Sequence, residues 1–184
     1  MSNSAPQILV GFNEKVVCLR VRGRGSFLNS GGVKQFAKEM IRRGHREFVV
    51  DLAECPMMDS TFMGTLTGIA LQLQSLGQGN LHVFRCNERN ADLLHGLGLD
   101  QILDVADEQP AANAGHEKNG TSIPELDAAA NQELPAARAD RQATAETMLA
   151  AHQALIDADP RNLSRFKDVL DYLKQDLQRE GSAD

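Results

Sequence analysis

The first hundred residues change repeatedly between two kinds of apolar spacing, and this pattern constrains the fold more than any other feature. Apolar residues at every second position, typical of half-buried strands, occur at 8–12 and 15–22. Apolar residues three and four positions apart, typical of amphipathic helices, occur at 33–41 and 62–76. Gly44 is well placed to end the first of these helices. The alternation predicts an α/β fold, a small mixed sheet with helices packed against it.

Further elements continue this alternation to residue 105. An almost unbroken apolar run at 48–52 is typical of a strand covered on both faces. We expect another strand at 81–84, a third helix at about 88–96 and a short last strand at 102–105. The glycines of 23–32 are interpreted as a loop before the first helix, where they provide a turn and close packing. About 100 residues are enough to bury one core.

A change of composition near residue 106 divides the chain into three parts. We expect a folded domain over 1–106 and a flexible linker over 107–140, where sustained apolar spacing is missing. Helical spacing returns over 141–180 in two stripes separated by Asp159 and Pro160, which predicts an antiparallel helical hairpin. Because two helices alone bury little, the hairpin is expected to dock on the first domain, on a second copy of the chain or on another protein.

Composition and charge exclude several functional classes. The formal net charge of -6, with seven Phe, one Tyr and no Trp, argues against nucleic acid as a partner. No apolar run approaches the roughly 18 residues of a membrane span, and the N-terminus lacks the pattern of a secretory signal. Cys18, Cys55 and Cys86 form no CxxC pair, so we expect reduced thiols in a cytoplasmic protein.

The sequence contains none of the usual catalytic or cofactor motifs. His82, Cys86 and His95 lack the spacing of zinc ligands. Neither a phosphate-binding P-loop nor a GxSxG nucleophile elbow occurs. We therefore expect no metal, no cofactor and no catalytic residue, and the chain is not expected to be an enzyme.

The strongest functional signal lies between Asp51 and Gly64, where a buried strand ends and a helix is expected to begin near Ser60. Asp59, Ser60 and Thr61 are all residues whose side chains accept hydrogen bonds from the free N–H groups of a helix start. The same N–H groups favour a bound anion. Ser60 therefore has two interpretations: a helix cap, or a phosphorylation site where a phosphate adds about -1.5 to -2 charges.

Over about residues 7–106 the sequence resembles the STAS domain family, the fold of bacterial anti-sigma factor antagonists. The most specific part is Asp59-Ser60-Thr61-Phe62-Met63-Gly64, which is similar to the family's Asp-Ser-Ser/Thr-Gly-Leu-Gly pattern. A second set of residues is similar to the family's third helix and the Gly-Leu segment after it: Leu94, Gly98, Leu99 and Ile102. The resemblance implies a STAS-like sheet flanked by helices.

The resemblance also implies a partner-switching function. The family's phosphorylated serine corresponds to Ser60. In its unphosphorylated form the protein would bind an anti-sigma factor that is also its serine kinase, and phosphorylation would break this complex. A phosphatase of the PP2C type would reset it. Asp59 would orient the Ser60 hydroxyl, and Thr61, Phe62 and Met63 would line the contact surface.

Some alternatives stay open at this point. The family commonly has glycine where this chain has Phe62, whose side chain packs inward with Leu66 and Ile69 or lies on the partner surface as an anchor. The alternative function is a non-enzymatic adaptor or structural subunit of a signalling or lipid-trafficking assembly, in which Ser60 is only a helix cap. A homodimer through the C-terminal helices is a further alternative.

Overall fold

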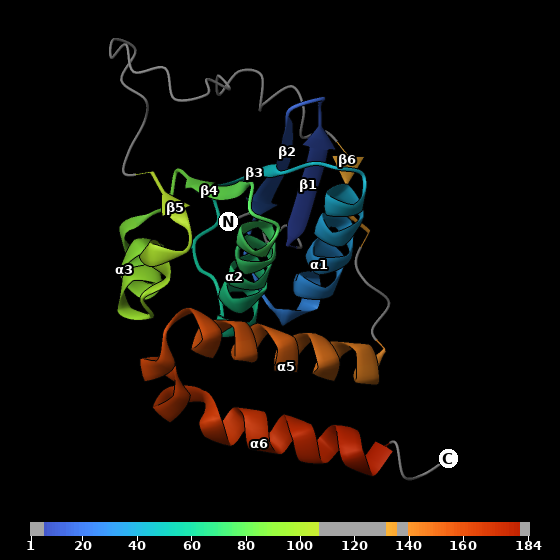
Figure 1. Ribbon diagram of the computed structural model, residues 1–184, viewed down its shortest axis with the longest axis vertical. Helices are drawn as coiled ribbons and strands as arrows, with labels where there is room; N and C mark the ends of the chain where they lie inside the picture. Colours follow the sequence, from blue (N-terminus) through green and yellow to red (C-terminus); the bar gives the residue numbers. More distant parts are fainter. Residues whose placement is uncertain (1–5, 107–131, 136–139, 181–184) are drawn as a thin grey trace.

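A computed structural model describes residues 6–106, 132–135 and 140–180, and within these ranges one six-stranded sheet organises the chain (Figure 1). The strand order is β5-β4-β3-β2-β1-β6. Strands β2 to β5 run parallel to one another, whereas β1 is antiparallel to both β2 and β6. The strands are β1 (Gln7–Phe12), β2 (Val16–Arg22), β3 (Glu47–Glu54), β4 (Asn80–Phe84), β5 (Asp104–Val105) and β6 (Gln132–Glu133). The expected small mixed sheet is confirmed.

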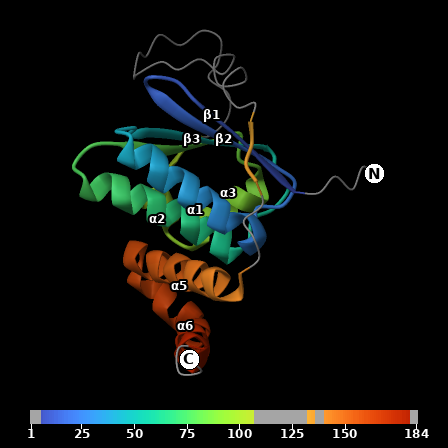
Figure 2. The same cartoon turned by 90° about the vertical axis from the view of Figure 1, so that its right-hand side faces the viewer.

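Helices cover one face of this sheet in two layers (Figure 2). The first layer contains α1 (Phe27–Arg42) and α2 (Ser60–Ser75), and α3 (Glu88–Gly96) lies beside β5. The second layer contains α5 (Arg141–Ala158) and α6 (Leu163–Glu180). Alternate residues of the strands point towards α1 and α2, so that strand periodicity and helix periodicity meet in one core. Examples of these core residues are Val17, Leu19, Phe48, Val50, Phe62, Leu66 and Leu73.

Helix α1 begins earlier than the glycine pattern predicts. Its N-cap is Ser26, whose backbone N–H donates to the side-chain oxygen of Asn29 at 2.9 Å. The glycines of 23–32 therefore do not all belong to a loop, because the last two lie inside the helix. Favourable capping at Ser26 outweighs the low helix propensity of these glycines.

A short strand occurs within the expected linker. Of residues 107–140 the structure describes only 132–135 and the last one, and the rest of the expected linker lies outside the described residues. Strand β6 pairs with β1, and the N–H of Leu134 donates to the carbonyl of Ile8 at 2.8 Å. The Leu134 side chain packs on the main core and lies next to Gly32, where an added Cβ would make an ordinary contact with it at 3.4 Å.

The expected C-terminal hairpin is confirmed, and it docks on the α/β domain. A one-turn helix that starts with Pro160 joins α5 to α6. Leu155 of α5 is fully buried and belongs to the same core as the sheet. The side-chain amide of Asn162 donates to the carbonyls of Leu97 and Leu155, at 2.9 and 2.8 Å, and so fastens the turn to the domain. Among the described helices, none has the length and apolar character needed to cross a membrane.

Candidate functional site

Asp59 joins the starts of two helices. It is the N-cap of α2, and one carboxylate oxygen accepts a hydrogen bond from the N–H of Phe62 at 2.9 Å. The other oxygen accepts from the N–H of Phe27, the first residue of α1, at 3.0 Å. The negative charge of Asp59 is also attracted by the positive ends of both helix dipoles. Asp59 therefore holds α1 and α2 in a fixed relation at the site.

Replacing Asp59 by alanine is expected to lower the free energy of unfolding by about 1 to 3 kcal/mol. One N-cap contributes about 0.5 to 2 kcal/mol, and this carboxylate serves two helices. Denaturant unfolding measures the change, with Asp92→Ala as the control, since Asp92 is an exposed acid on α3. Equal stability of the two variants would contradict the double-cap role.

Ser60 is the first residue of α2, and its hydroxyl contacts α5. The Ser60 Oγ lies 3.1 Å from Nε2 of His152, and Nδ1 of His152 lies 2.8 Å from the carbonyl oxygen of Met148. Because a carbonyl only accepts, this contact favours the tautomer with the hydrogen on Nδ1, in which Nε2 accepts from the Ser60 hydroxyl. The interpretation of Ser60 as a helix cap is wrong, because Asp59 takes that role.

His152 is the site residue that the sequence analysis missed. Its ring is only 3% exposed and packs edge-on against Phe166 of α6, with ring centroids 5.1 Å apart. In the sequence it is one member of an apolar stripe, and 92 positions separate it from Ser60. A serine beside a histidine is the start of a nucleophilic site. Here, however, α5 lies over the pair, and His152 itself is buried.

The other residues expected on the contact surface are buried. Thr61, Phe62 and Met63 all lie in the interior, because α2 has the sheet on one side and α5 on the other. Phe62 packs in the main core together with Leu66 and Ile69, as the inward alternative predicted. These three side chains therefore do not form an exposed surface in this conformation, and their role in partner binding stays a prediction. Asp59 and Ser60 remain partly exposed.

Three solved structures are similar to this chain, and the first of them supports the fold. TM1081 of Thermotoga maritima, assigned as an anti-sigma factor antagonist, is 22% identical, with a TM-score of 0.50 over 55% of this chain and 86% of that chain. The anti-sigma factor antagonist SpoIIAA in its unphosphorylated form is 14% identical, with a TM-score of 0.47 over 57% and 90%. The phosphorylated form of SpoIIAA from Bacillus is 15% identical, with a TM-score of 0.45 over 55% and 92%.

Comparison at the level of sequence identifies the family. No curated protein matches the chain. The profile of the STAS domain matches residues 7–112, which is more than half of the chain and includes β1 to β5 with α1, α2 and α3. The segment from Asp59 to Gly64, with its double cap and its serine at the start of a helix, lies in the middle of this match. The chain therefore belongs to the STAS domain family.

Proposed function

We propose that this STAS protein is a cytoplasmic, non-enzymatic partner-switching module, similar to anti-sigma factor antagonists and regulated by reversible phosphorylation of Ser60. Its unphosphorylated form binds an anti-sigma factor that is also its serine kinase. Phosphorylation breaks the complex, and a phosphatase of the PP2C type restores it. The observation that carries the proposal is the position of Ser60 as the first residue of α2, directly after the Asp59 cap.

The electrostatics of the helix start explain how a phosphate would act as a switch. A phosphate on Ser60 would be attracted by the first turn of α2, where helix N–H groups and the dipole favour an anion. It would also stand beside the Asp59 carboxylate, which already accepts from the N–H of Phe62. About two added negative charges would therefore change the charge of the surface at the start of α2.

Exposed apolar residues next to the cap supply contact area for a partner. Phe27 and Leu28 begin α1 and are 42% and 63% exposed. The N–H of Phe27 donates to Asp59, so these residues lie beside the start of α2. An apolar patch next to a charge switch is suited to a complex that forms and dissociates. We therefore include Phe27 and Leu28, with Asp59 and Ser60, in the proposed contact surface.

Phosphorylation of Ser60 is the direct test. The purified chain is incubated with ATP and each serine kinase encoded beside its gene, and the modified residue is mapped by mass spectrometry. Phosphate is expected on Ser60 in the native chain and in Ser75→Ala, a matched change at the exposed end of α2, and is expected to be absent in Ser60→Ala. Ser60→Asp is expected to weaken binding of the kinase by about tenfold or more, or about 1.4 kcal/mol.

The adaptor role is the second candidate, and one observation favours it. Helix α6 carries three exposed apolar side chains, Leu163, Val169 and Tyr172. A chain that is never phosphorylated on Ser60, and that binds its partners equally well as Ser60→Ala, would contradict the switch. Loss of partner binding after Tyr172→Ala in the same assay would then support the adaptor.

A further inference from the structure

Helix α5 approaches α2 so closely that only glycine fits at the crossing. A Cβ added to Gly64 would overlap the carbonyl oxygen of Ala151 and would lie 2.6 Å from its carbonyl carbon. These are backbone atoms, so they cannot move without moving α5 itself. Gly64 is one helical turn after Ser60 and lies on the same face of α2. The backbone of α5 therefore crosses the turn that carries the proposed switch (Figure 1).

The face of α2 under α5 consists of small residues. Ser60, Gly64 and Gly68 follow one another at four-residue intervals, and we call them the Ser60 face. The large side chains of α2 point instead into the main core: Phe62, Leu66, Ile69 and Leu73. Departure of α5 would expose the backbone and the serine hydroxyl of this face, together with the part of the main core that Leu155 covers.

The buried hydroxyl groups of α2 do not need α5 as a partner. Thr65 donates to the carbonyl of Thr61 at 2.8 Å, and Thr67 donates to the carbonyl of Met63 at 2.9 Å. Both bonds lie within α2, so they persist whether or not α5 is present. The buried residues of α5 are also mostly small, with Leu155 as the one large aliphatic among them: Ala145, Thr147, Ala151, His152, Ala154 and Leu155.

A phosphate on Ser60 would disturb the contact that this residue makes with α5. The Ser60 hydroxyl donates its hydrogen to Nε2 of His152 at 3.1 Å. A phosphoryl group on Oγ replaces that hydrogen and adds a phosphorus and three oxygens next to an atom that already touches the ring of α5. His152 is buried, and its ring packs edge-on against Phe166 of α6. Docking of α5 and phosphorylation of Ser60 are linked. If a phosphate on Ser60 weakens the docking of α5, then docked α5 disfavours phosphorylation of Ser60 to the same extent.

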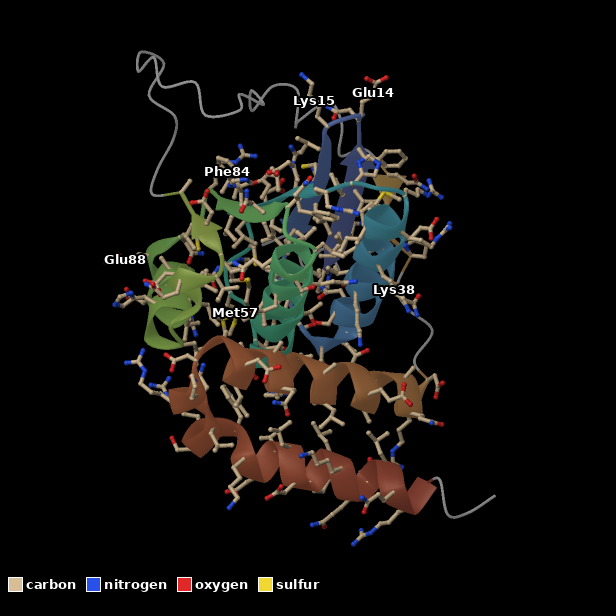
Figure 3. The ribbon with its side chains drawn as sticks, viewed as in Figure 1. Glu14, Lys15, Lys38, Met57, Phe84 and Glu88 are labelled. Carbon is tan, nitrogen blue, oxygen red and sulfur yellow. The ribbon has the colours of Figure 1, made fainter. Side chains whose placement is uncertain are left out.

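We infer that the α5–α6 hairpin is an internal competitor for the Ser60 face of α2. Docked, it shields Ser60 from the kinase; released, it makes the Ser60 face available. This inference rests on the proposed function of Ser60 and adds its regulation. Figure 3 shows Met57, just before the start of α2, on the side of the domain that faces α5, as the competition requires.

The accessibility of position 60 tests the inference without a kinase. Ser60→Cys is placed in a Cys86→Ser background, where the two remaining native thiols are buried, and the rate of reaction with iodoacetamide is measured on the full chain. Adding Gly64→Ala is expected to raise the rate about tenfold or more, because the new Cβ displaces α5. Gly68→Ala is the matched control, since its Cβ would lie 3.6 Å from Ala154, an ordinary contact. Both changes give α2 the same gain in helix propensity.

A second pair of variants keeps the test valid if Gly64→Ala does not fold. If circular dichroism shows that Gly64→Ala does not fold, His152→Ala is compared with Gln153→Ala, an exposed neighbour on α5. The first is expected to accelerate labelling and the second to leave it unchanged. Equal labelling in both members of a pair would overturn the inference, and so would labelling at position 60 as fast as in an exposed Ser75→Cys control.

The experiments distinguish failure of the inferred shielding by α5 from failure of the proposed function. If Gly64→Ala accelerates labelling but Ser60 is never phosphorylated by any candidate kinase, the shielding of Ser60 by α5 is supported and the proposed function fails. If Ser60 is phosphorylated at the same rate in the native chain and in Gly64→Ala, the proposed function is supported and the shielding of Ser60 by α5 is contradicted. Faster phosphorylation in Gly64→Ala than in Gly68→Ala would support both.

Discussion

Replacement of Phe62 by alanine is expected to lower the free energy of unfolding by about 3 to 5 kcal/mol, the range for a fully buried aromatic residue. The ring is 1% exposed and belongs to the main core. Phe62 lies two residues after Ser60, so the first turn of α2 is packed on the core through this ring. Denaturant unfolding measures the loss, and an unchanged dependence on denaturant concentration would show that the variant still unfolds as one unit.

Gly25 provides an internal check on this prediction. A Cβ added to Gly25 would lie 2.7 Å from Cδ1 of Phe62, so Gly25→Ala is expected to destabilise the native chain. In a chain that already carries Phe62→Ala the same change meets no ring, and its cost is expected to fall. Additive effects in this double-mutant cycle would contradict the packing, and so would a loss for Phe62→Ala no greater than for the exposed Phe27→Ala.

The pairing of Phe62 with Gly25 explains how this chain departs from the usual family pattern. A glycine at position 62 would leave α2 without a large side chain at this point of the core. Here the ring fills that space, and the facing loop has no side chain at Gly25. The departure therefore concerns packing within the domain, and Phe62 is not an anchor on the exposed surface in this conformation.

The elements of the sheet and its helices were predictable because their signals are local. Alternation at 15–22 identifies β2, and the run at 48–52 identifies the buried β3. The sequence predicts the start of α2 near Ser60 because Asp59 and its neighbours are good capping residues, and the helix begins at Ser60. Local patterns of this kind depend only on residues within one or two turns of each other.

The features that sequence analysis missed all depend on contacts between distant segments. His152 pairs with Ser60 across 92 positions, and in its own helix it resembles any other member of a buried stripe. Strand β6 has only two residues, too few to show alternation, and it is held by pairing with β1. The docking of the hairpin depends on the glycine at position 64, whose purpose appears only when Ala151 is placed beside it.

Asp51 lies on the other face of the sheet and is the most deeply buried charge of the domain's strands, at 4% exposure. Its carboxylate accepts from Nε of Arg20 and from Nε of Arg85, each at 2.9 Å, and from the N–H of Ala53 at 3.0 Å. Burial alone would raise the pKa of Asp51. The hydrogen bonds from Arg85, Ala53 and Arg20 outweigh burial and hold the pKa below its ordinary value of 3.8.

Asp51→Asn is therefore expected to lower the free energy of unfolding at pH 7 by about 2 to 4 kcal/mol. Removing one member of a buried ion pair costs about 3 to 5 kcal/mol, and the partial exposure of Arg85 places this case towards the lower end. Because the folded pKa is depressed, the ionised carboxylate stabilises the fold above about pH 3.8. That contribution is lost as the pH falls below this value. The difference between the two chains in denaturant unfolding is thus expected to be full at pH 7 and to shrink below pH 3.8.

The exposed pair of Arg22 and Glu54 supplies the control, and Glu54→Gln is expected to cost about 0.5 kcal/mol or less. A gap between Asp51→Asn and the native chain that stays constant down to pH 2.5 would contradict the assignment of this stability to the ionised carboxylate.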